Sequence, residues 1–173
     1  MSPAMPVLET DRLVLREYTP DDATVVLALL NEPSFLRYIG DRGVRTLDDA
    51  RAYLRNGPLA SYEKNGFGLY AVERKDEPGV IGQCGLLRRD GLDDPDIGFS
   101  FFPAHWGQGY AYEAARAVIV HGQKTLGLRR IVAITSFDND ASIRLLEKLG
   151  FRFERTLRIP NDDEELRLFA LEA

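Results

Sequence analysis

A chain of 173 residues is long enough for one ordinary domain with a full hydrophobic core and too short for two catalytic domains. Its 45% apolar and 28% charged residues are typical of a globular protein, and no apolar run approaches the roughly 20 residues that span a bilayer. The formal charge of -5, the single cysteine and the two histidines argue against a broad nucleic-acid surface, an internal disulfide and a metal site.

These properties set the expectations for location and domain organisation. We expect a cytoplasmic protein, because the N-terminus has no basic region followed by an apolar segment. We expect no membrane, nucleic-acid or metal partner. Residues 1–8 are predicted to be a flexible tail and residues 9–173 a single domain, because no repeat or Gly/Ser/Pro-rich linker divides the chain.

The first third of the chain predicts one strand and two helices. Arg12–Glu17 alternates as a strand does, and Thr19–Asp22 then supplies an N-cap, a proline at the first helical position and acidic residues in the first turn. The helix that follows should stop before Pro33. Thr46–Asp49 repeats the starting signal for a second helix, which Gly57-Pro58 closes.

Three strands follow, joined by polar turns. Gly68–Glu73 and Val80–Leu87 are apolar runs connected by the turn residues Lys75–Gly79, which is typical of a hairpin. After an acidic loop over Asp90–Asp96, the residues Ile97–Phe102 predict the third strand of this group.

The last third of the chain alternates helices with strands. Small and apolar residues at helical spacing, β-branched runs and C-terminal glycines mark the boundaries. Helices are predicted from Gly109 to Gly127 and from Asp138 to Gly150, and strands over Arg130–Thr135, Arg152–Ile159 and Glu165–Leu171. The order β-α-α-β-β-β-α-β-α-β-β predicts an α/β fold, with a mixed sheet and helices on both of its faces.

The loop between the third strand of the group and the long helix carries the strongest functional signal. A strand that enters a glycine-bearing loop opening into a helix brings backbone N–H groups and the helix dipole together, which suits an anion. Gly107 and Gly109 let a diphosphate approach the main chain without meeting a Cβ, and the small Ala111 keeps the helix entry open. The loop lacks the G-x-x-x-x-G-K-[ST] pattern and the third glycine of a dinucleotide fingerprint. The alternative interpretation is a tight turn before a packed helix.

The six residues from Trp106 to Ala111 occupy the six places of the pattern [Q/R]-x-x-G-x-[G/A] and match it after the first place, so the loop resembles motif A of the GCN5-related N-acetyltransferase (GNAT) superfamily. Trp106 departs from the usual Gln or Arg. However, W-G-x-G-Y-A-x-E-A, complete here through Ala114, is the form found in the ribosomal-protein N-acetyltransferase (RimJ/RimL-like) branch. Asn139–Phe151 is similar to that branch's N-x-x-S-x-x-x-x-x-K-x-G-F segment, and Thr10–Arg16 matches its opening residues.

The resemblance implies a GNAT-like fold with a central splayed sheet, and acetyl transfer from acetyl-CoA to a primary amine by direct attack in a ternary complex. In such a fold the strand before the loop leaves its neighbour, and its free main chain pairs with the pantetheine arm of acetyl-CoA. The cofactor-binding residues implied are Phe99, Phe101, Phe102, Gly107, Gln108, Gly109, Tyr110, Ala111, Asn139 and Lys148. Lys148 would meet the adenosine phosphates, although a solvated helix charge is the other explanation. A homodimer is common in such families.

The chemistry needs a base, because an amine attacks a thioester only when neutral, whereas its pKa lies at about 8 for an α-amino group and about 10.4 for a lysine. Asp96 stands where many relatives place an acid and is the candidate base, with a solvated loop residue as the alternative; His105 is a second candidate. Leu146 takes the place of the tyrosine that protonates the departing thiolate in many family members. Ser142 is therefore the candidate catalytic donor, unless its hydroxyl only satisfies the first turn of its helix.

The acceptor stays open between a protein N-terminal amine, a small amine and an aminoglycoside-like compound. The acidic segments Asp90–Asp96 and Asn161–Glu165 would favour a cationic acceptor if both border the cleft. A different function also remains open, that of a catalytically weak CoA-binding sensor or interaction module. Cys84 is predicted to be a small buried strand residue rather than a carrier of the acetyl group.

Overall fold

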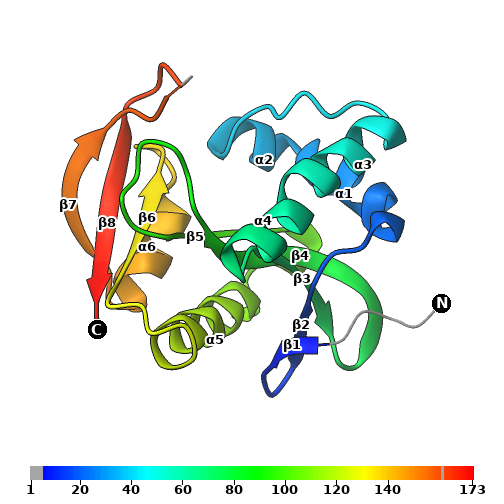
Figure 1. The fold of residues 1–173 in the computed structure, drawn as a ribbon, viewed down its shortest axis with the longest axis horizontal. Helices are drawn as coiled ribbons and strands as arrows, with labels where there is room; N and C mark the ends of the chain where they lie inside the picture. The colour runs from blue at the N-terminus through cyan, green and yellow to red at the C-terminus, as the bar shows by residue number, and fades with distance from the viewer. Residues whose placement is uncertain (1–5, 161) are drawn as a thin grey trace.

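A computed structural model describes residues 6–160 and 162–173, which form a single eight-stranded sheet flanked by helices (Figure 1). The strands are β1 (Pro6–Glu9), β2 (Leu13–Arg16), β3 (Leu69–Arg74), β4 (Glu77–Leu87), β5 (Asp96–Phe101), β6 (Arg130–Thr135), β7 (Arg152–Leu157) and β8 (Leu166–Glu172). Their order across the sheet is β1-β2-β3-β4-β5-β6-β8-β7. Every neighbouring pair is antiparallel except β5 and β6, which are parallel. The mixed α/β sheet expected from the sequence is confirmed.

Helices cover the two faces of the sheet in two groups (Figure 1). The first group is η1 (Pro20–Asp22), α1 (Ala23–Leu30), α2 (Pro33–Tyr38), α3 (Leu47–Asn56) and α4 (Pro58–Asn65), and the second is α5 (Tyr110–Lys124) with α6 (Asp140–Lys148). A separate hydrophobic core lies under each group. Ala114, Val118 and Leu146 belong to the core under α5 and α6, whereas Val26 and Leu54 belong to the core under α1 and α3.

Two of these helices, α2 and α4, are missing from the order predicted by the sequence. Pro33 and Pro58 are interpreted there as helix stops, but each occupies the first turn of a new helix. A proline suits that position because its missing N–H has no partner in a helical first turn and its φ is already helical. A proline between two helices is therefore both a stop and a start.

The predicted tail is also partly wrong. Residues 1–5 lie outside the described residues, but residues 6–8 belong to β1, which pairs with β2 in an antiparallel register that begins at Pro6↔Arg16. The strand is only four residues long and lies at the edge of the sheet. Such a short edge strand has no apolar alternation by which a sequence could reveal it.

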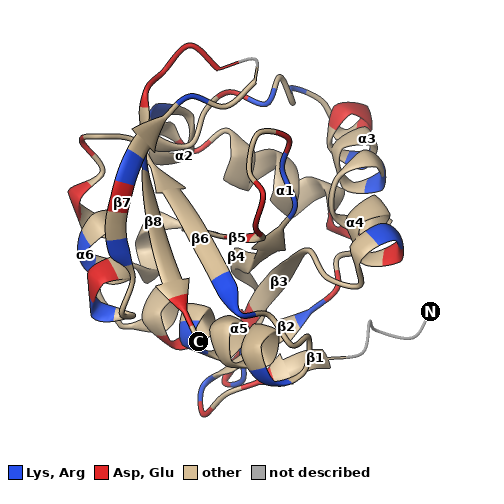
Figure 2. Ribbon diagram, turned by 60° about the vertical axis from the view of Figure 1, so that its left-hand side comes forward, with Lys and Arg blue, Asp and Glu red and all other residues tan. Residues whose placement is uncertain are grey.

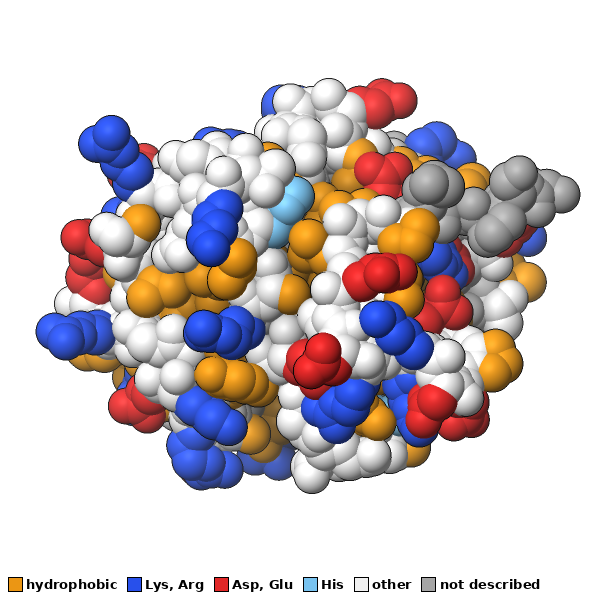
Figure 3. Space-filling model, turned by 90° about the horizontal axis from the view of Figure 1, so that it is seen from below, with side chains coloured by type: hydrophobic (Ala, Val, Ile, Leu, Met, Phe, Trp, Pro, Cys, Tyr) orange, Lys and Arg blue, Asp and Glu red, His pale blue; other side chains and the backbone are white. Residues whose placement is uncertain are grey.

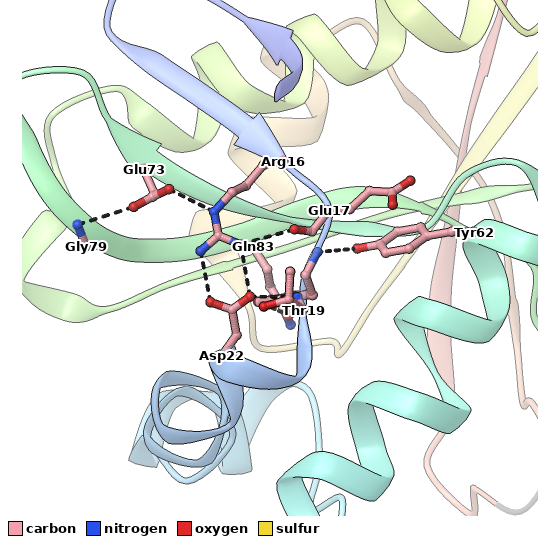
Figure 4. Close-up of polar contacts among 9 residues, drawn as sticks. Arg16, Glu17, Thr19, Asp22, Tyr62, Glu73, Gly79 and Gln83 are labelled. Atoms are coloured by element: carbon pink, nitrogen blue, oxygen red, sulfur yellow. Dashed lines mark hydrogen bonds and ion pairs between the residues drawn. The ribbon is translucent and has the colours of Figure 1, made fainter. Parts of the chain in front are cut away.

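A buried ion cluster fixes the first helical group against the sheet (Figure 4). Arg16, at the end of β2, donates from Nη2 to Asp22 Oδ1 of η1 and from Nε to Glu73 Oε2 of β3, both at 2.9 Å. The same guanidinium donates to the carbonyl of Glu17 at 3.1 Å. Because only 16% of the Arg16 side chain is exposed, these bonds satisfy a charge that would be costly to bury alone. The cluster sets the position of the helices that line one side of the cleft described below.

The sheet splays between β5 and β6. β5 pairs with β4 along its whole length, from Leu87↔Asp96 to Gly82↔Phe101, but with β6 only at Asp96↔Val132. The two parallel strands therefore diverge beyond Asp96, which confirms the splayed sheet that the resemblance implies. No helix within residues 6–160 and 162–173 is long and apolar enough to cross a membrane.

Candidate active site

One cavity of about 700 Å³ opens where β5 and β6 diverge, and it is walled by α2, α6 and the loop that precedes α5. It brings together most of the site residues predicted from the sequence, namely Asp96, Phe99, Phe101, Gly107, Gly109, Tyr110, Ala111, Asn139, Ser142 and Lys148. Phe102 and Gln108 do not line it. The predicted site residues that line this cavity thus include pairs as far apart in the sequence as Asp96 and Lys148, which are separated by 52 positions.

The glycine loop presents main chain rather than side chains to this cavity. Gly107 and Gly109 have φ of +76° and +81°, a backbone region that residues with a Cβ rarely adopt. Both are exposed, and a Cβ on Gly107 would meet no protein atom within 4 Å. Gly109 is the N-cap of α5, so the unpaired N–H groups of the first helical turn begin at the cavity. An anion can reach these amides without steric obstruction.

The hydrogen bonds of β5 decide which of its residues can meet a ligand between the splayed strands. The N–H of Phe102 donates to the carbonyl of Ile81 on β4 at 3.0 Å, and the carbonyl of Phe102 accepts from the N–H of His105 at 2.9 Å. Both main-chain groups of Phe102 are therefore occupied, which corrects its inclusion in the cofactor-binding set. Alternate residues of a strand direct their main chain to opposite neighbours, so Phe99 and Phe101 face the open side.

The carbonyl of Phe101 has a partner of its own. The indole Nε1 of Trp106 donates to it at 2.8 Å, although 53% of the Trp106 residue surface is exposed. The tryptophan that departs from the family pattern thus ties the end of β5 to the glycine loop. The amide of Phe101 and the main chain of Phe99 remain directed toward the gap beside β6.

The start of α6 brings Asn139 and Ser142 to the opposite wall. Asn139 is the N-cap of α6, and its side-chain Oδ1 accepts from the N–H of Ser142 at 3.3 Å. The cap uses the main chain of Ser142, so the hydroxyl is not the group that satisfies the first turn. Leu146, one helical turn further, is 1% exposed and belongs to the core. It cannot supply the hydroxyl that many relatives have at this place.

Lys148 lies at the other end of the same helix, close to the first turn of α5. Its Nζ is 4.3 Å from the centroid of the Tyr112 ring, which is a cation–π distance. The ammonium group therefore lies against a side chain of the first turn of α5, although Lys148 is exposed.

Asp96 is not the solvated loop residue that the alternative interpretation describes. It is 0% exposed at the closed end of the splay, and its Oδ2 accepts from Arg89 Nε at 2.8 Å. Its Oδ1 is buried without a hydrogen-bond partner among the described residues. Burial raises the pKa of this carboxyl, and the nearby Arg89 opposes the rise only in part. An acid with a raised pKa and a free oxygen on a cavity is suited to accept a proton.

Two other reactive side chains have less suitable surroundings. Cys84 is fully buried, and burial raises the pKa of its thiol, which makes it a poor nucleophile. His105 lines the cavity with its Nδ1 buried and unpartnered in the part of the chain that is described, and its ring lies 6.4 Å from that of Tyr110. No group of three or more His, Cys, Asp or Glu that could hold a metal ion is found within residues 6–160 and 162–173.

A buried polar row on the cavity floor was not predicted from the sequence. The hydroxyl of Tyr18 donates to Gln83 Oε1 at 2.9 Å, and Gln83 Nε2 donates to Ser100 Oγ at 3.3 Å. Gln83 and Ser100 both line the cavity, on adjacent strands β4 and β5. The signal that could have revealed them is a single polar residue within each of two otherwise apolar strands.

Charged residues outside the glycine loop and α6 also line the cavity. Three of them, Glu32, Asp162 and Glu164, are acidic, and Arg42 is basic. The two acidic connections, β4–β5 and β7–β8, stand out in red in Figure 2. Of the acidic residues within Asp90–Asp96, only Asp96, at the start of β5, lines the cavity. On the face shown in Figure 3, by contrast, basic, acidic and apolar side chains are interspersed.

Comparison with known proteins assigns the fold to a family. Residues 12–152 match the family model described as "Acetyltransferase (GNAT) domain". The chain belongs to the GNAT superfamily. It is 36% identical to the N-acetyltransferase YoaA of Bacillus subtilis, over 88% of this chain and 86% of that one. The protein is accordingly an acetyl-CoA-dependent N-acetyltransferase.

Solved GNAT structures share its fold. A GNAT-family acetyltransferase from Bacillus anthracis superposes with a TM-score of 0.78 and 26% identity, covering 95% of this chain and 97% of that one. RimL, a ribosomal L7/L12 α-N-protein acetyltransferase whose structure contains coenzyme A, has a TM-score of 0.82 at 16% identity, covering 97% and 98%. The fold resemblance to the ribosomal-protein branch is thus confirmed.

Proposed function

We propose that this GNAT enzyme acetylates the primary amine of a cationic acceptor, by direct attack of the amine on acetyl-CoA in a ternary complex. One observation carries the proposal. The glycine loop, the open side of β5, the start of α6 and the buried carboxyl of Asp96 all line a single cavity. The same proposal treats the chain from β1 onward as one catalytic domain, which the continuous sheet supports. A homodimer and a cytoplasmic location stay predictions.

The cavity suits acetyl-CoA in the orientation that the resemblance implies. The amides from Gly107 to Ala111 would bind the diphosphate, and Lys148 would lie beside the phosphates of the adenosine end. The main chain of Phe99 and the amide of Phe101 would pair with the pantetheine arm, and Asn139 would lie at its thiol end. Gln108 does not line the cavity, and its main-chain N–H would contribute only as part of the loop between Gly107 and Gly109.

Asp96 accepts the proton of the amine, and Ser142 stabilises the departing thiolate by a hydrogen bond. Asp96 takes a proton from the acceptor ammonium or its attacking nitrogen, directly or through water, so that the nitrogen lone pair can form the new C–N bond. A main-chain N–H on the open side of β5, near Phe101, would stabilise the developing oxyanion. As the C–S bond breaks, the sulfur takes both bonding electrons, and the Ser142 hydroxyl donates a hydrogen bond to the thiolate. Arg89 holds the Asp96 carboxyl in place.

The acidic residues that line the cavity favour an acceptor with positive charge. Glu32, Asp162 and Glu164 line the cavity together with Arg42, whereas the charge of Arg89 is paired with Asp96. A protein N-terminus close to a basic residue, a polyamine or an aminoglycoside-like compound fits this description. The fold shared with RimL, which is named for acetylating a ribosomal protein, supports testing a protein N-terminus first.

The experiment is a free-thiol assay with acetyl-CoA and a panel of amines. The panel contains peptides with basic and acidic second residues, polyamines, single amino acids and aminoglycosides. Thiol release that depends on the acceptor, and is faster for the cationic member of each matched pair, supports the proposal. Saturable CoA binding without release across the panel would instead favour the sensor, and faster release with acidic acceptors would contradict the role of the three carboxylates.

A further inference from the structure

We propose that Arg12 is a positioning residue for the diphosphate-binding loop. It binds the loop on the side away from the cavity, and its positive charge offsets the negative charge of Glu113 in the first turn of α5. The inference rests on the proposed function, because it takes the glycine loop as the diphosphate site. It concerns residues outside the cavity wall that holds the reacting groups, on the segment between β1 and β2.

A network of hydrogen bonds joins this segment to the loop. Arg12 donates from Nη1 to the carbonyl of Gln108 at 2.9 Å and from Nε to Glu113 Oε1 at 2.7 Å. The main-chain N–H of Arg12 also donates to Glu113 Oε2 at 3.0 Å, and the hydroxyl of Thr10 donates to the same oxygen. The guanidinium thus connects a loop carbonyl to the helix that follows the loop.

The packing of the guanidinium explains the conformation at the end of the loop. Its Cζ lies 4.4 Å from the centroid of the buried Tyr110 ring, so an aromatic face supports it. A Cβ built on Gly109 would lie 3.3 Å from Arg12 Nη2. A side chain at position 109 would therefore press on Arg12 rather than project away from the protein. Gly109 is required for this close approach as well as for its positive φ.

Arg12 also compensates the negative charge of Glu113. A carboxylate in the first turn of a helix interacts favourably with the helix dipole, and it repels an anion that binds to the same N-terminus. Although partial burial opposes the effect, hydrogen bonds from Thr10 and Arg12 lower the pKa of Glu113, so that it stays ionised at neutral pH. The positive charge of Arg12 at 2.7 Å offsets it. The amides of the loop are then left to attract the diphosphate.

The network also accounts for two separated parts of the sequence pattern. Thr10 and Arg12 come from the opening segment, and Glu113 comes from the segment after the glycine loop, about 100 positions later. Their side chains meet at one point behind the loop.

The test compares two acetyl donors with the same thioester. Acetyl-CoA carries the diphosphate, whereas S-acetylpantetheine ends before it. For Arg12→Ala we expect kcat/KM to fall about tenfold with acetyl-CoA, the factor that corresponds to 1.4 kcal/mol, and to stay nearly unchanged with S-acetylpantetheine. Arg51→Ala is the matched control, since the Arg51 side chain is as exposed as that of Arg12 and pairs with Asp48 on α3, outside the cleft. The double variant Arg12→Ala/Glu113→Gln should recover part of the loss, because it removes the uncompensated carboxylate.

The outcomes separate this inference from the proposed function. If Arg12→Ala lowers kcat/KM equally for both donors, or for neither, the positioning role is wrong. If the double variant is as poor as Arg12→Ala or poorer, the charge-cancelling role is wrong. If the wild-type enzyme itself does not prefer acetyl-CoA to S-acetylpantetheine, the fault lies with the diphosphate site and hence with the proposed function.

Discussion

A methyl group added to Gly107 should separate the binding role of the glycine loop from its effect on folding. Gly107 has φ of +76° and open space where a Cβ would stand, and Gly66, at the end of α4, has φ of +79° and equally open space. Alanine in this backbone region costs about 1–2 kcal/mol at either position. In a chain of this length, each kcal/mol lowers Tm by roughly 2–4 °C. Gly107→Ala and Gly66→Ala should therefore show similar losses of Tm.

Only Gly107→Ala should weaken the binding of CoA. Its methyl group would occupy the space through which a diphosphate reaches the amides, and each hydrogen bond lost to a charged group costs about 1.5–3 kcal/mol. Losing one such bond raises Kd by about 10- to 100-fold. Isothermal titration calorimetry with CoA measures this directly. The reasoning is refuted if Gly107→Ala and Gly66→Ala bind CoA with the same affinity.

The remaining predictions concern the residues around the reacting centre. Ser142→Ala should lower kcat in the thiol-release assay while leaving the Kd of CoA unchanged, because the helix cap uses the Ser142 main chain; a wild-type kcat would remove its role. Asp96→Asn should lower kcat and flatten its rise with pH. Burial raises the pKa of Asp96, so the wild-type rate should increase through a pKa above the ordinary value of about 3.9 as the carboxylate forms. If Asp96→Asn keeps the same rise of rate with pH, Asp96 is not the base. The raised pKa also means that the folded state binds the Asp96 proton more tightly than the unfolded state does. The free energy of unfolding of the wild type should therefore fall as pH rises from about 4 through that pKa. Urea unfolding of the wild type and of Asp96→Asn at several pH values should show this fall in the wild type only. Asn139→Ala should lower the free energy of unfolding by about 1 kcal/mol, because the N-cap of α6 is lost, and should also raise the KM for acetyl-CoA. Thermal melts measure the first effect and the thiol-release assay the second. A lower Tm with an unchanged KM would leave Asn139 a purely structural role.

Features with local causes could be predicted from the sequence. The strand, glycine loop and helix around Gly107 follow from residues that are neighbours in the chain, and so does the N-cap at Asn139. The structure places these segments as expected. Helices α2 and α4 were missed for a local reason as well, because Pro33 and Pro58 carry two opposite meanings at a boundary.

Features that depend on pairing between distant segments could not be predicted. Phe102 was included as a ligand residue because the resemblance implies that the strand before the loop pairs with the pantetheine arm, but its orientation depends on the register of β4 and β5 and on its bond to Ile81. Asp96 ends an acidic segment that looks solvated in sequence, and only the folding of Arg89 over it makes a buried ion pair. The contact between Arg12 and Glu113 crosses about 100 residues and likewise exists only once β2 lies against α5.

The central claim, that the main chain of residues 107–111 binds the diphosphate of acetyl-CoA, is tested most directly by a crystal structure of the protein with CoA. We predict that amide nitrogens of this loop lie about 2.7–3.2 Å from diphosphate oxygens, with the pantetheine arm between β5 and β6. CoA held elsewhere, with these amides facing water or protein atoms, would contradict the account.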